Sequence, residues 1–345
     1  MPPALDLYAA QVRIGPRDYE SADGFAEHME ALVRQIDAQR PRAENGSPIR
    51  PALAVFPENI GTFLALEGVP LALTERLPRT EAALGLLAAR HPVDLAWACA
   101  RRRSSNLSGA LLLARGRRMH EIYHATFSHL AREHRLAIVA GSILLPENAL
   151  GPEAPILEER SGDVYNLSYV FDERGLGIAV VKKVHLEPTL EDRLGLSPGE
   201  PGQVGPISAA WGRFATLICY DGFCEPYTRG ERFEPLSPRL DRLGVDVFAQ
   251  PAANSWPWDS AWAFADPGEH ILRREQWRRE GVAAALAACT RTRFAVTAHL
   301  CGRMFERSFE GRSEILARGR DGAVRVLAQA PRIDGEAIVR ATVEL

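Results

Sequence analysis

Short apolar runs alternate with longer amphipathic segments along most of the 345-residue chain. The apolar runs are rich in Val, Ile and Ala and have the length of β-strands, whereas the longer segments repeat their apolar residues every three or four positions, as helices do. This pattern predicts strands over 4–11, 51–56, 94–99, 109–114, 136–144, 164–172, 177–185, 213–219, 245–250, 294–299, 312–318, 323–328 and 337–343, and helices over 20–38, 81–90, 120–134 and 273–290. The sequence therefore predicts an α/β protein.

The alternation of strands and helices keeps the same character from one end of the chain to the other. The segment RPRAENGSPIRP, residues 40–51, is polar and rich in turn formers, which predicts a surface loop and not a linker between domains. The sequence contains no internal repeat and no low-complexity tract. We therefore expect a single domain over residues 1–345, long enough to bury a sizeable core.

Composition and charge argue against several classes of partner. The 41 basic and 44 acidic residues are interspersed and leave a formal net charge of −3, so no basic face favours nucleic acid. The first residues lack a signal-peptide pattern, and no apolar run approaches the roughly 18 residues of a membrane span. The five cysteines are scattered, without a Cys-x-x-Cys pair, which indicates reduced thiols and no structural zinc site. We expect a cytoplasmic protein that binds neither nucleic acid nor membranes.

Lysine is almost absent from the chain. Two of the 41 basic residues are lysines, and they are adjacent, Lys182 and Lys183, in the segment VVKKVHL. An arginine guanidinium is planar and bulky, whereas a lysine ammonium is a compact donor that can approach a single oxygen in a tight pocket. A lysine that arginine has not replaced is therefore a candidate for chemistry, with chance survival at a strand end as the alternative. Because side chains alternate along a strand, the two lysines cannot face the same cavity.

Three apolar runs end in polar residues that can perform catalysis. Glu58 ends the run PALAVFPEN, Cys219 lies at the strand end in RFATLICYDGF, and Lys183 lies toward the end of a third run. Strand ends are where α/β folds place their sites. Together the three groups suffice for acyl transfer: Glu58 would take the thiol proton, the Cys219 thiolate would attack a carbonyl or nitrile carbon, and Lys183 would stabilise the developing charge. Each residue alone is usually structural, but their conjunction indicates a thiol hydrolase.

These motifs make the chain resemble the nitrilase superfamily, the carbon-nitrogen hydrolases, in which Glu, Lys and Cys occur in that order. The matching motifs are FPEN with Glu58, KKVHL with Lys183 and LICYDGF with Cys219. Supporting segments are LAREHRLAIVAGS at 130–142, YNLSYVFDERG at 165–175, VDVFAQPAAN at 245–254 and FEGRSEIL at 309–316. A single motif of this length arises often by chance, but several in one order rarely do.

The resemblance implies a four-layer αββα sandwich, two face-to-face sheets with helices outside, assembled as a homodimer or higher homo-oligomer. It also implies that Glu58 deprotonates Cys219, and that Lys183 and the backbone amide of Tyr220 hold the tetrahedral intermediate. Ammonia or an amine then leaves, and water activated by Glu58 hydrolyses the remaining thioester. Such a reaction needs no metal and no organic cofactor.

The chain departs from the family pattern after the cysteine, where Phe223-Cys224-Glu225-Pro226 stands in place of Phe-Pro-Glu, and at two further points. Members often place a second glutamate about seven residues after the lysine, where it orients the amine. Glu191 is our candidate here, with Glu187 and Asp192 as rivals. The segment between Glu58 and Lys183 is longer than usual, so the region 65–120 is expected to carry an insertion that shapes the substrate pocket or an interface.

The substrate class can be narrowed a little. The Tyr220-Asp221 pair resembles the amidase and carbamoylase branches, whereas true nitrilases tend to have Trp-Glu after the cysteine. We therefore expect a small amide or carbamoyl substrate, with nitrile hydrolysis by the same triad as the alternative. Asn254 and Trp256, in the loop ANSWPWDSAW, are candidates for the pocket wall, and core or dimer packing is their alternative role.

A further motif indicates a different chemistry. Residues 120–124 match H-E-x-x-H, the helix motif in which two histidines one turn apart bind zinc and the glutamate activates water. The extended form of the motif needs a third histidine at position 130, which is Leu130, and Glu147 is the remaining candidate ligand. We therefore favour surface histidines, His120 and His124, on an amphipathic helix over a zinc hydrolase. A catalytically inactive scaffold is a third alternative that no sequence feature supports directly.

Overall fold

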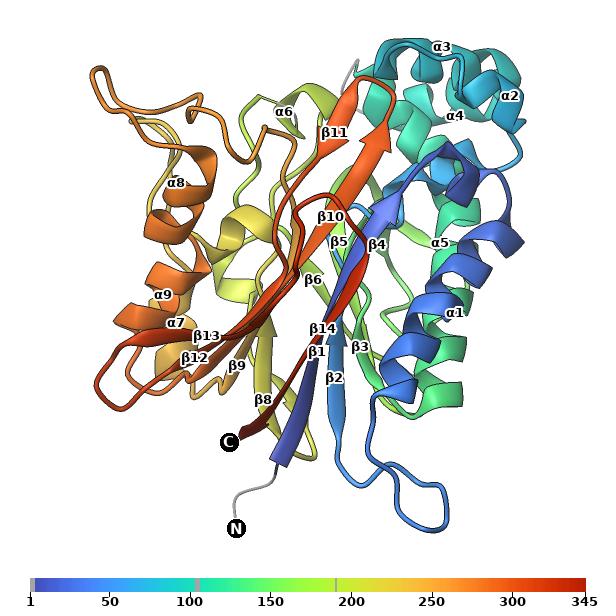
Figure 1. Ribbon diagram of the computed structural model, residues 1–345. Coiled ribbons are helices and arrows are strands. Elements are labelled where there is room, and N and C mark those ends of the chain that lie inside the picture. The colour runs from blue at the N-terminus through green and yellow to red at the C-terminus, as the bar shows by residue number, and fades with distance from the viewer. Residues whose placement is uncertain (1–3, 103–105, 190) are drawn as a thin grey trace.

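The helices and strands of the computed structural model follow one another much as the hydrophobic pattern predicts (Figure 1). The model describes residues 4–102, 106–189 and 191–345. The strands are β1 (Ala4–Ile14), β2 (Ala52–Val55), β3 (Ala137–Val139), β4 (Ile143–Asn148), β5 (Glu159–Phe171), β6 (Gly177–Lys182), β7 (Ile207–Ala209), β8 (Gly212–Thr216), β9 (Val247–Ala253), β10 (Phe294–Met304), β11 (Arg307–Phe309), β12 (Glu314–Arg318), β13 (Val324–Gln329) and β14 (Ala337–Glu344). The helices are α1 (Ala22–Ala38), α2 (Leu71–Thr74), α3 (Thr80–Arg90), α4 (Pro92–Arg101), α5 (Leu107–His134), α6 (Glu191–Leu194), α7 (Ser237–Arg242), α8 (Arg273–Glu280) and α9 (Val282–Ala288).

The strands form two sheets that join at one place. The first sheet has the order β6-β5-β3-β2-β1-β14, with β4 also paired to β5. The second has the order β7-β8-β9-β10-β12-β13, with β11 also paired to β10. Parallel pairing of β1 with β10 over Val12–Ile14 connects the two sheets. β2 runs parallel to β1 and β3, and β9 runs parallel to β8 and β10, so the residues that follow β2, β8 and β9 gather at the same end of the sheets.

Alternation along β1 shows how the layers are built. Leu5 and Leu7 belong to a buried cluster that contains residues of both sheets, whereas Tyr8 and Val12 belong to a cluster with the apolar faces of α1 and α5. Successive side chains of a strand point to opposite faces, so one strand supplies both cores. Figure 1 shows α1 and α5 on one side of the sheets and α7, α8 and α9 on the other. The order of layers is helix, sheet, sheet, helix, which confirms the predicted αββα sandwich.

Two segments predicted as strands, 94–99 and 109–114, are helical. They lie in α4 and at the start of α5. Both are short runs rich in Ala and Leu, which favour helices, and a run this short has no period that distinguishes a strand from a buried helix. Local helix signals were present: Pro92 begins α4, and the side chain of Asn106 accepts a hydrogen bond from the amide of Gly109 at the start of α5. The region 65–120 thus supplies α2, α3, α4 and the start of α5.

Two further predicted elements are each divided at a glycine. The strand predicted over 136–144 becomes β3 and β4, separated at Gly141, whose φ is +71° and whose missing Cβ would lie 2.1 Å from the carbonyl oxygen of Pro57. The helix predicted over 273–290 becomes α8 and α9, separated at Gly281. Gly141 therefore lets the chain pass closely against the residue that precedes Glu58.

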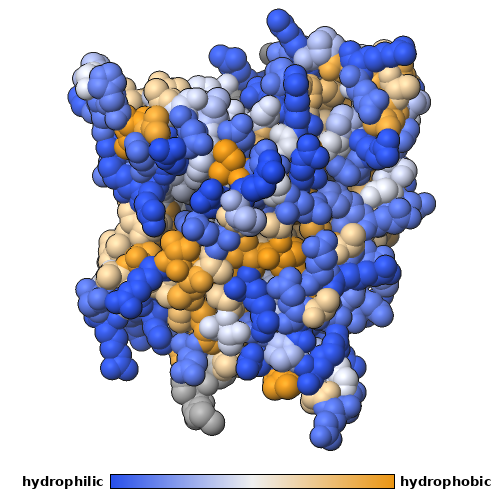
Figure 2. Space-filling model, viewed as in Figure 1, coloured by the Kyte–Doolittle hydropathy of each residue, from blue (hydrophilic) through white to orange (hydrophobic). Residues whose placement is uncertain are grey.

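The surface combines hydrophilic residues with an apolar band. Figure 2 shows mostly hydrophilic residues at the edges of one face, with apolar residues gathered at its middle, where Figure 1 labels β12, β13 and β14. Leu327 of β13 is 45% exposed. Within the described ranges, no helix combines the length and the apolar character that a membrane crossing requires.

Candidate active site

Glu58 lies three residues beyond the end of β2, and it is almost completely buried. The next residue, Asn59, has a φ of +62° and donates its backbone N–H to the hydroxyl of Ser142 at 2.9 Å. One carboxylate oxygen of Glu58, Oε2, accepts a hydrogen bond from the backbone N–H of Ala253 at 3.1 Å. The turn after β2 and the end of β9 therefore hold this carboxylate in one place.

Lys183 follows the last residue of β6 and points into the molecule. Its Nζ donates to Oε1 of Glu58 at 2.7 Å and to Oε2 of Glu191 at 2.6 Å, and its side chain is 2% exposed. Its neighbour Lys182 points elsewhere, pairs with Glu147 at 3.0 Å and is 20% exposed. The prediction that alternation separates the two lysines is confirmed.

A second carboxylate and an amide complete the cluster around Lys183. Glu191, the first residue of α6, accepts hydrogen bonds at Oε2 from Lys183 and from the backbone N–H of Glu187 at 2.8 Å. Asn166 on β5 donates its Nδ2 to Glu58 at 3.0 Å and to Glu191 at 2.9 Å. Of the predicted rivals, Glu187 accepts instead from Thr189. The side chain of the other rival, Asp192, lies outside the described part of the structure.

Asn166 was not among the residues selected from the sequence. It lies in the apolar strand segment 164–172, where a polar amide must find partners once it is buried. That conflict between an apolar strand and a buried amide is the signal that could have identified it. Its Nδ2 is a common donor to the two carboxylates that also accept from Lys183.

Cys219 begins a short 3-10 turn, Cys219–Gly222, that follows β8. Its φ is +49°, in the left-handed region that residues with a Cβ rarely occupy. The side chain of Gln250 donates to the carbonyl oxygen of Cys219 at 2.8 Å, and a Cβ on Gly222 would lie 2.4 Å from the same amide nitrogen. The hydrogen bond from Gln250 therefore stabilises the strained turn that carries the Cys219 thiol.

The thiol of Cys219 lies close to the carboxylate cluster through Ala253. The Cys219 Sγ is 3.7 Å from the carbonyl oxygen of Ala253, whose N–H donates to Glu58. Burial, with a further contribution from the charge of Glu58, raises the pKa of the Cys219 thiol well above its ordinary value. The resting thiol is therefore protonated, and a base must remove its proton before it can act as a nucleophile.

Burial acts in opposite directions on the pKa values of Glu58 and Lys183. Burial raises the pKa of Glu58, while the Lys183 ammonium opposes that rise and the charge of Glu191 adds to it. Burial by itself lowers the pKa of Lys183, but the carboxylates of Glu191 and Glu58 raise it well above its ordinary value. Lys183 therefore stays protonated, and the raised pKa of Glu58 makes its carboxylate a stronger base than an ordinary carboxylate.

A cavity of about 30 Å³ lies at this cluster, with Glu58, Lys183, Glu191 and Cys219 in its wall. Further lining residues include Tyr220, whose side-chain hydroxyl donates to Glu231 at 2.7 Å, and Asn59, Glu187, Tyr227, Ala253, Ser255, Trp256 and Phe309. The space holds about one or two water molecules. All three residues predicted for catalysis therefore meet at one small cavity together with Glu191.

The two residues predicted for the pocket wall are placed differently. Trp256 lines the cavity, but Asn254 does not, because its side chain is fully buried and bonded to its neighbours. Its Nδ2 donates to the backbone of Trp256 at 2.6 Å and of Glu310 at 2.9 Å, and its Oδ1 accepts from Arg273 at 2.9 Å. Asn254 thus positions the loop that carries Trp256 and has no face toward the cavity.

The histidines of the H-E-x-x-H motif are buried, and the prediction of surface histidines is wrong. His120 and His124 are at most 5% exposed and pack against Tyr169 of β5 at ring separations of 5.5 and 6.3 Å. Burial lowers the pKa of His120 to about 4. Glu121 of the motif pairs with Arg118 at the exposed side of α5. Among the described residues, no group of three or more His, Cys, Asp and Glu side chains could hold a metal ion.

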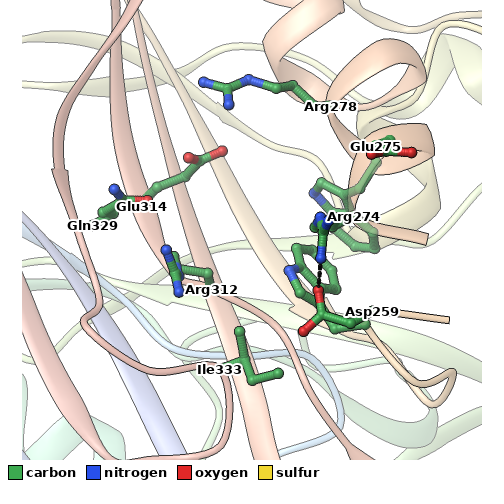
Figure 3. Close-up of a pocket in the computed structure, with 10 residues that line it drawn as sticks. Asp259, Arg274, Glu275, Arg278, Arg312, Glu314, Gln329 and Ile333 are labelled. Carbon is green, nitrogen blue, oxygen red and sulfur yellow. Dashed lines mark hydrogen bonds and ion pairs between the residues drawn. The ribbon is translucent and has the colours of Figure 1, made fainter. Parts of the chain in front are cut away.

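A larger cleft of about 440 Å³ lies between α8 and the strands β12 and β13. Figure 3 shows Arg274 and Arg278 of α8 facing Arg312 and Glu314 across it, with Arg274 paired to Asp259. Burial raises the pKa of Glu314 to about 7, against the influence of Arg278 and Arg312. None of its described lining residues belongs to the cavity at Cys219, and none is a cysteine, so size alone does not identify the reactive site.

The sequence is similar to those of two curated amidases. It is 27% identical over 216 residues to 2-oxoglutaramate amidase of Bacillus subtilis (strain 168), a match that covers 62% of this chain and 64% of that protein. It is 29% identical over 133 residues to omega-amidase NIT3 of Saccharomyces cerevisiae, covering 36% of this chain and 38% of that protein. The chain thus matches less than two thirds of the length of either relative. No family model matches it.

The fold is similar to solved structures over almost the whole chain. A carbon-nitrogen hydrolase from Helicobacter pylori G27 matches 99% of this chain and 89% of its own, with a TM-score of 0.55 and 15% identity. Saccharomyces cerevisiae Nit3, a member of branch 10 of the nitrilase superfamily, matches 99% of this chain and 90% of its own, with a TM-score of 0.53 and 17% identity. At these identities the likeness concerns the fold, and it agrees with the sequence matches. The chain therefore shares the fold of nitrilase-superfamily structures and is similar in sequence to two amidases.

Proposed function

We propose that this protein is a thiol-dependent amidase that hydrolyses the C–N bond of small non-peptide amides or carbamoyl compounds. The observation that carries the proposal is the buried Lys183 ammonium, held between the carboxylates of Glu58 and Glu191 in the wall of the cavity that also contains Cys219. Burying an ammonium group costs desolvation free energy, so a buried cation in the wall of a cavity is a candidate for a functional role. The names of the two relatives support the same class of reaction.

In the proposed first step, Glu58 accepts the proton of the Cys219 thiol as the thiolate attacks the amide carbon. The carbonyl oxygen gains the negative charge. An ammonium has three N–H bonds, and among the described residues Lys183 donates two of them to Glu58 and Glu191. The third remains for the oxygen of the tetrahedral intermediate, with the backbone N–H of Tyr220 as the proposed second donor.

In the second step, Glu58 returns its proton to the nitrogen, the C–N bond breaks and ammonia or an amine leaves. A thioester to Cys219 remains. Water then attacks the thioester, Glu58 accepts a proton from that water, and the proton passes to the departing sulfur. The sum is one amide and one water converted to one carboxylic acid and one amine. A carboxyl group with a raised pKa suits these alternating roles, and Asn166 and Glu191 act as positioning residues.

The test is ammonia release from a panel of small compounds by the wild type and by Cys219→Ala. The panel contains acetamide, 2-oxoglutaramate, a carbamoyl amino acid and the corresponding nitriles, and it is repeated with a chelator. We expect at least one amide or carbamoyl compound to be hydrolysed with chelator present, and the Cys219→Ala variant to be inactive. Activity retained without the thiol would contradict the proposal, and turnover confined to nitriles would replace it by nitrile hydrolysis.

The acyl-enzyme is tested separately by mass spectrometry of acid-quenched protein during turnover. We expect the mass of the acyl group on the peptide that contains Cys219.

A homodimer and a cytoplasmic location remain predictions, and the apolar band over β12, β13 and β14 in Figure 2 offers a dimer a surface to bury. Sedimentation velocity at two protein concentrations tests that assembly.

A further inference from the structure

A second cavity, almost entirely apolar, adjoins the cavity at Cys219. Its volume is about 120 Å³, and its wall contains side chains such as Phe63, Leu66, Ala83, Leu87 and Leu112. Arg307 is the charged residue among the described lining residues, and it lies 3.7 Å from the carboxylate of Glu306. A cavity with this lining favours an apolar occupant.

The two cavities share part of their walls. Asn59 and Phe309 line both of them, and Asn59 is the residue directly after Glu58. The short helix α6 also contributes to both walls, because Glu191 at its start lines the cavity at Cys219 and Leu194 at its end lines the apolar cavity. A group bound in the apolar cavity would therefore lie beside the carboxylates that surround Lys183.

Hydrogen bonds fix several of the segments that form the wall of the apolar cavity. The side chain of Glu306, at the turn between β10 and β11, accepts hydrogen bonds from the backbone N–H and the hydroxyl of Thr80 at the start of α3, each at 2.8 Å. Arg115 of α5 donates to the carbonyl oxygens of Ala65 at 3.3 Å and Glu67 at 3.0 Å, and Ala65 is part of the wall. The Thr80 contacts join α3 to the β10–β11 turn, and the Arg115 contacts hold residues 65–67 against α5.

We infer that the apolar cavity binds the acyl chain of the substrate, and that this chain is an unbranched alkyl or phenyl group. The inference rests on the proposed amidase function. An engineered apolar cavity of about 150 Å³ binds benzene, so a cavity of this size suits about six carbon atoms. The acyl group stays bound through both acylation and deacylation, whereas the amine leaves after the first step. A permanent apolar pocket therefore serves the acyl side.

The first experiment measures kcat/KM for straight-chain primary amides from acetamide to octanamide. Burial of each methylene favours binding, so kcat/KM should rise about fourfold per added carbon until the cavity is full, and then level off. N-hexylacetamide carries the same chain on the amine side and should gain nothing over N-methylacetamide. A gain for N-hexylacetamide without one for hexanamide would overturn the assignment to the acyl side.

The second experiment changes the cavity. Ala83 is buried in its wall on α3, whereas Ala89 of the same helix is exposed. Ala83→Phe should reduce the ratio of kcat/KM for hexanamide to that for acetamide by tenfold or more, and Ala89→Phe should leave that ratio at the wild-type value. Leu87→Ala enlarges the same cavity and should move the preferred chain to a greater length, which keeps the test informative if Ala83→Phe does not fold.

The outcomes separate this inference from the proposed function. An active enzyme with no dependence on chain length, or with the same ratio in Ala83→Phe as in Ala89→Phe, would overturn the inference and leave the amidase proposal intact. If no amide is hydrolysed, binding of hexanamide and acetamide to Cys219→Ala is measured by calorimetry. Tighter binding of hexanamide that disappears with Ala83→Phe would support the apolar cavity and count against the amidase. Equal binding of both amides would count against both.

Discussion

Replacement of Lys183 by arginine separates the chemistry of the amine from its charge. The lysine Nζ lies 2.7 and 2.6 Å from two carboxylate oxygens, and the side chain is 2% exposed. A planar guanidinium is longer and wider, so it cannot occupy that point and still offer a single N–H to the substrate oxygen. Loss of one oxyanion donor costs a factor of about 10²–10³ in kcat, or roughly 3–4 kcal/mol. We expect Lys183→Arg to lose at least that much activity.

The adjacent lysine provides the matched control. Lys182 pairs with Glu147 at 3.0 Å and lies over the ring of Tyr165 at 4.4 Å, with 20% of its side chain exposed. Arginine can make both contacts, and a partly exposed pair contributes at most about 1 kcal/mol. Lys182→Arg should therefore change kcat/KM by less than about twofold, since the cost of a surface pair is small and lies away from the reacting atoms.

The assay is kcat/KM for the best amide of the panel, with thermal unfolding of each variant as a check on folding. Lys183→Arg should lose activity while it keeps a cooperative unfolding transition. Activity of that variant near the wild-type level would refute the role of a single-point donor. An equal loss in Lys182→Arg and Lys183→Arg would show that the loss comes from the strand and not from the cluster.

Three other variants test separate parts of the argument. Cys219→Gly should be more stable in urea than Cys219→Ala by about 1 kcal/mol, because glycine accepts the φ of +49° without strain; equal stabilities would argue against strain. Asn166→Leu removes a donor to the Glu58 carboxylate, so the pKa of Glu58 should rise further and the acidic limb of the kcat/KM profile should move to higher pH; an unshifted limb would contradict this. Burial lowers the pKa of His299 to about 3. The unfolded state therefore binds more protons than the folded state as the pH falls through 6.5, and the free energy of unfolding decreases as the pH is lowered. Between pH 7 and 5, His299→Leu should lose about 2 kcal/mol less stability than the wild type, measured by urea unfolding at both pH values.

Much of the fold could be predicted because its signals are local. Strand alternation in β1 and the helical period of α1 depend on neighbours a few residues away, and both were predicted correctly. The errors lie where local signals conflict. The Ala- and Leu-rich runs 94–99 and 109–114 carry no period long enough to read, and the helix caps beside them were the better evidence. The prediction of exposed histidines on α5 was wrong for another reason, because the burial of a residue depends on what packs against its helix face.

The order of the residues along the chain, with Glu58, Lys183 and Cys219 each at the end of an apolar run, was sufficient to select candidates for chemistry. It could not show which glutamate reaches the lysine, that Asn166 donates to both carboxylates, or that Asn254 does not line the cavity. Those facts depend on hydrogen bonds between side chains far apart in sequence, such as the one from Lys183 to Glu58. The packing of α3 and α5 against the β10–β11 turn likewise creates an apolar cavity that no single segment contains. Local periodicity acts over a few residues, whereas a site is defined by distances that only the packed sheets establish.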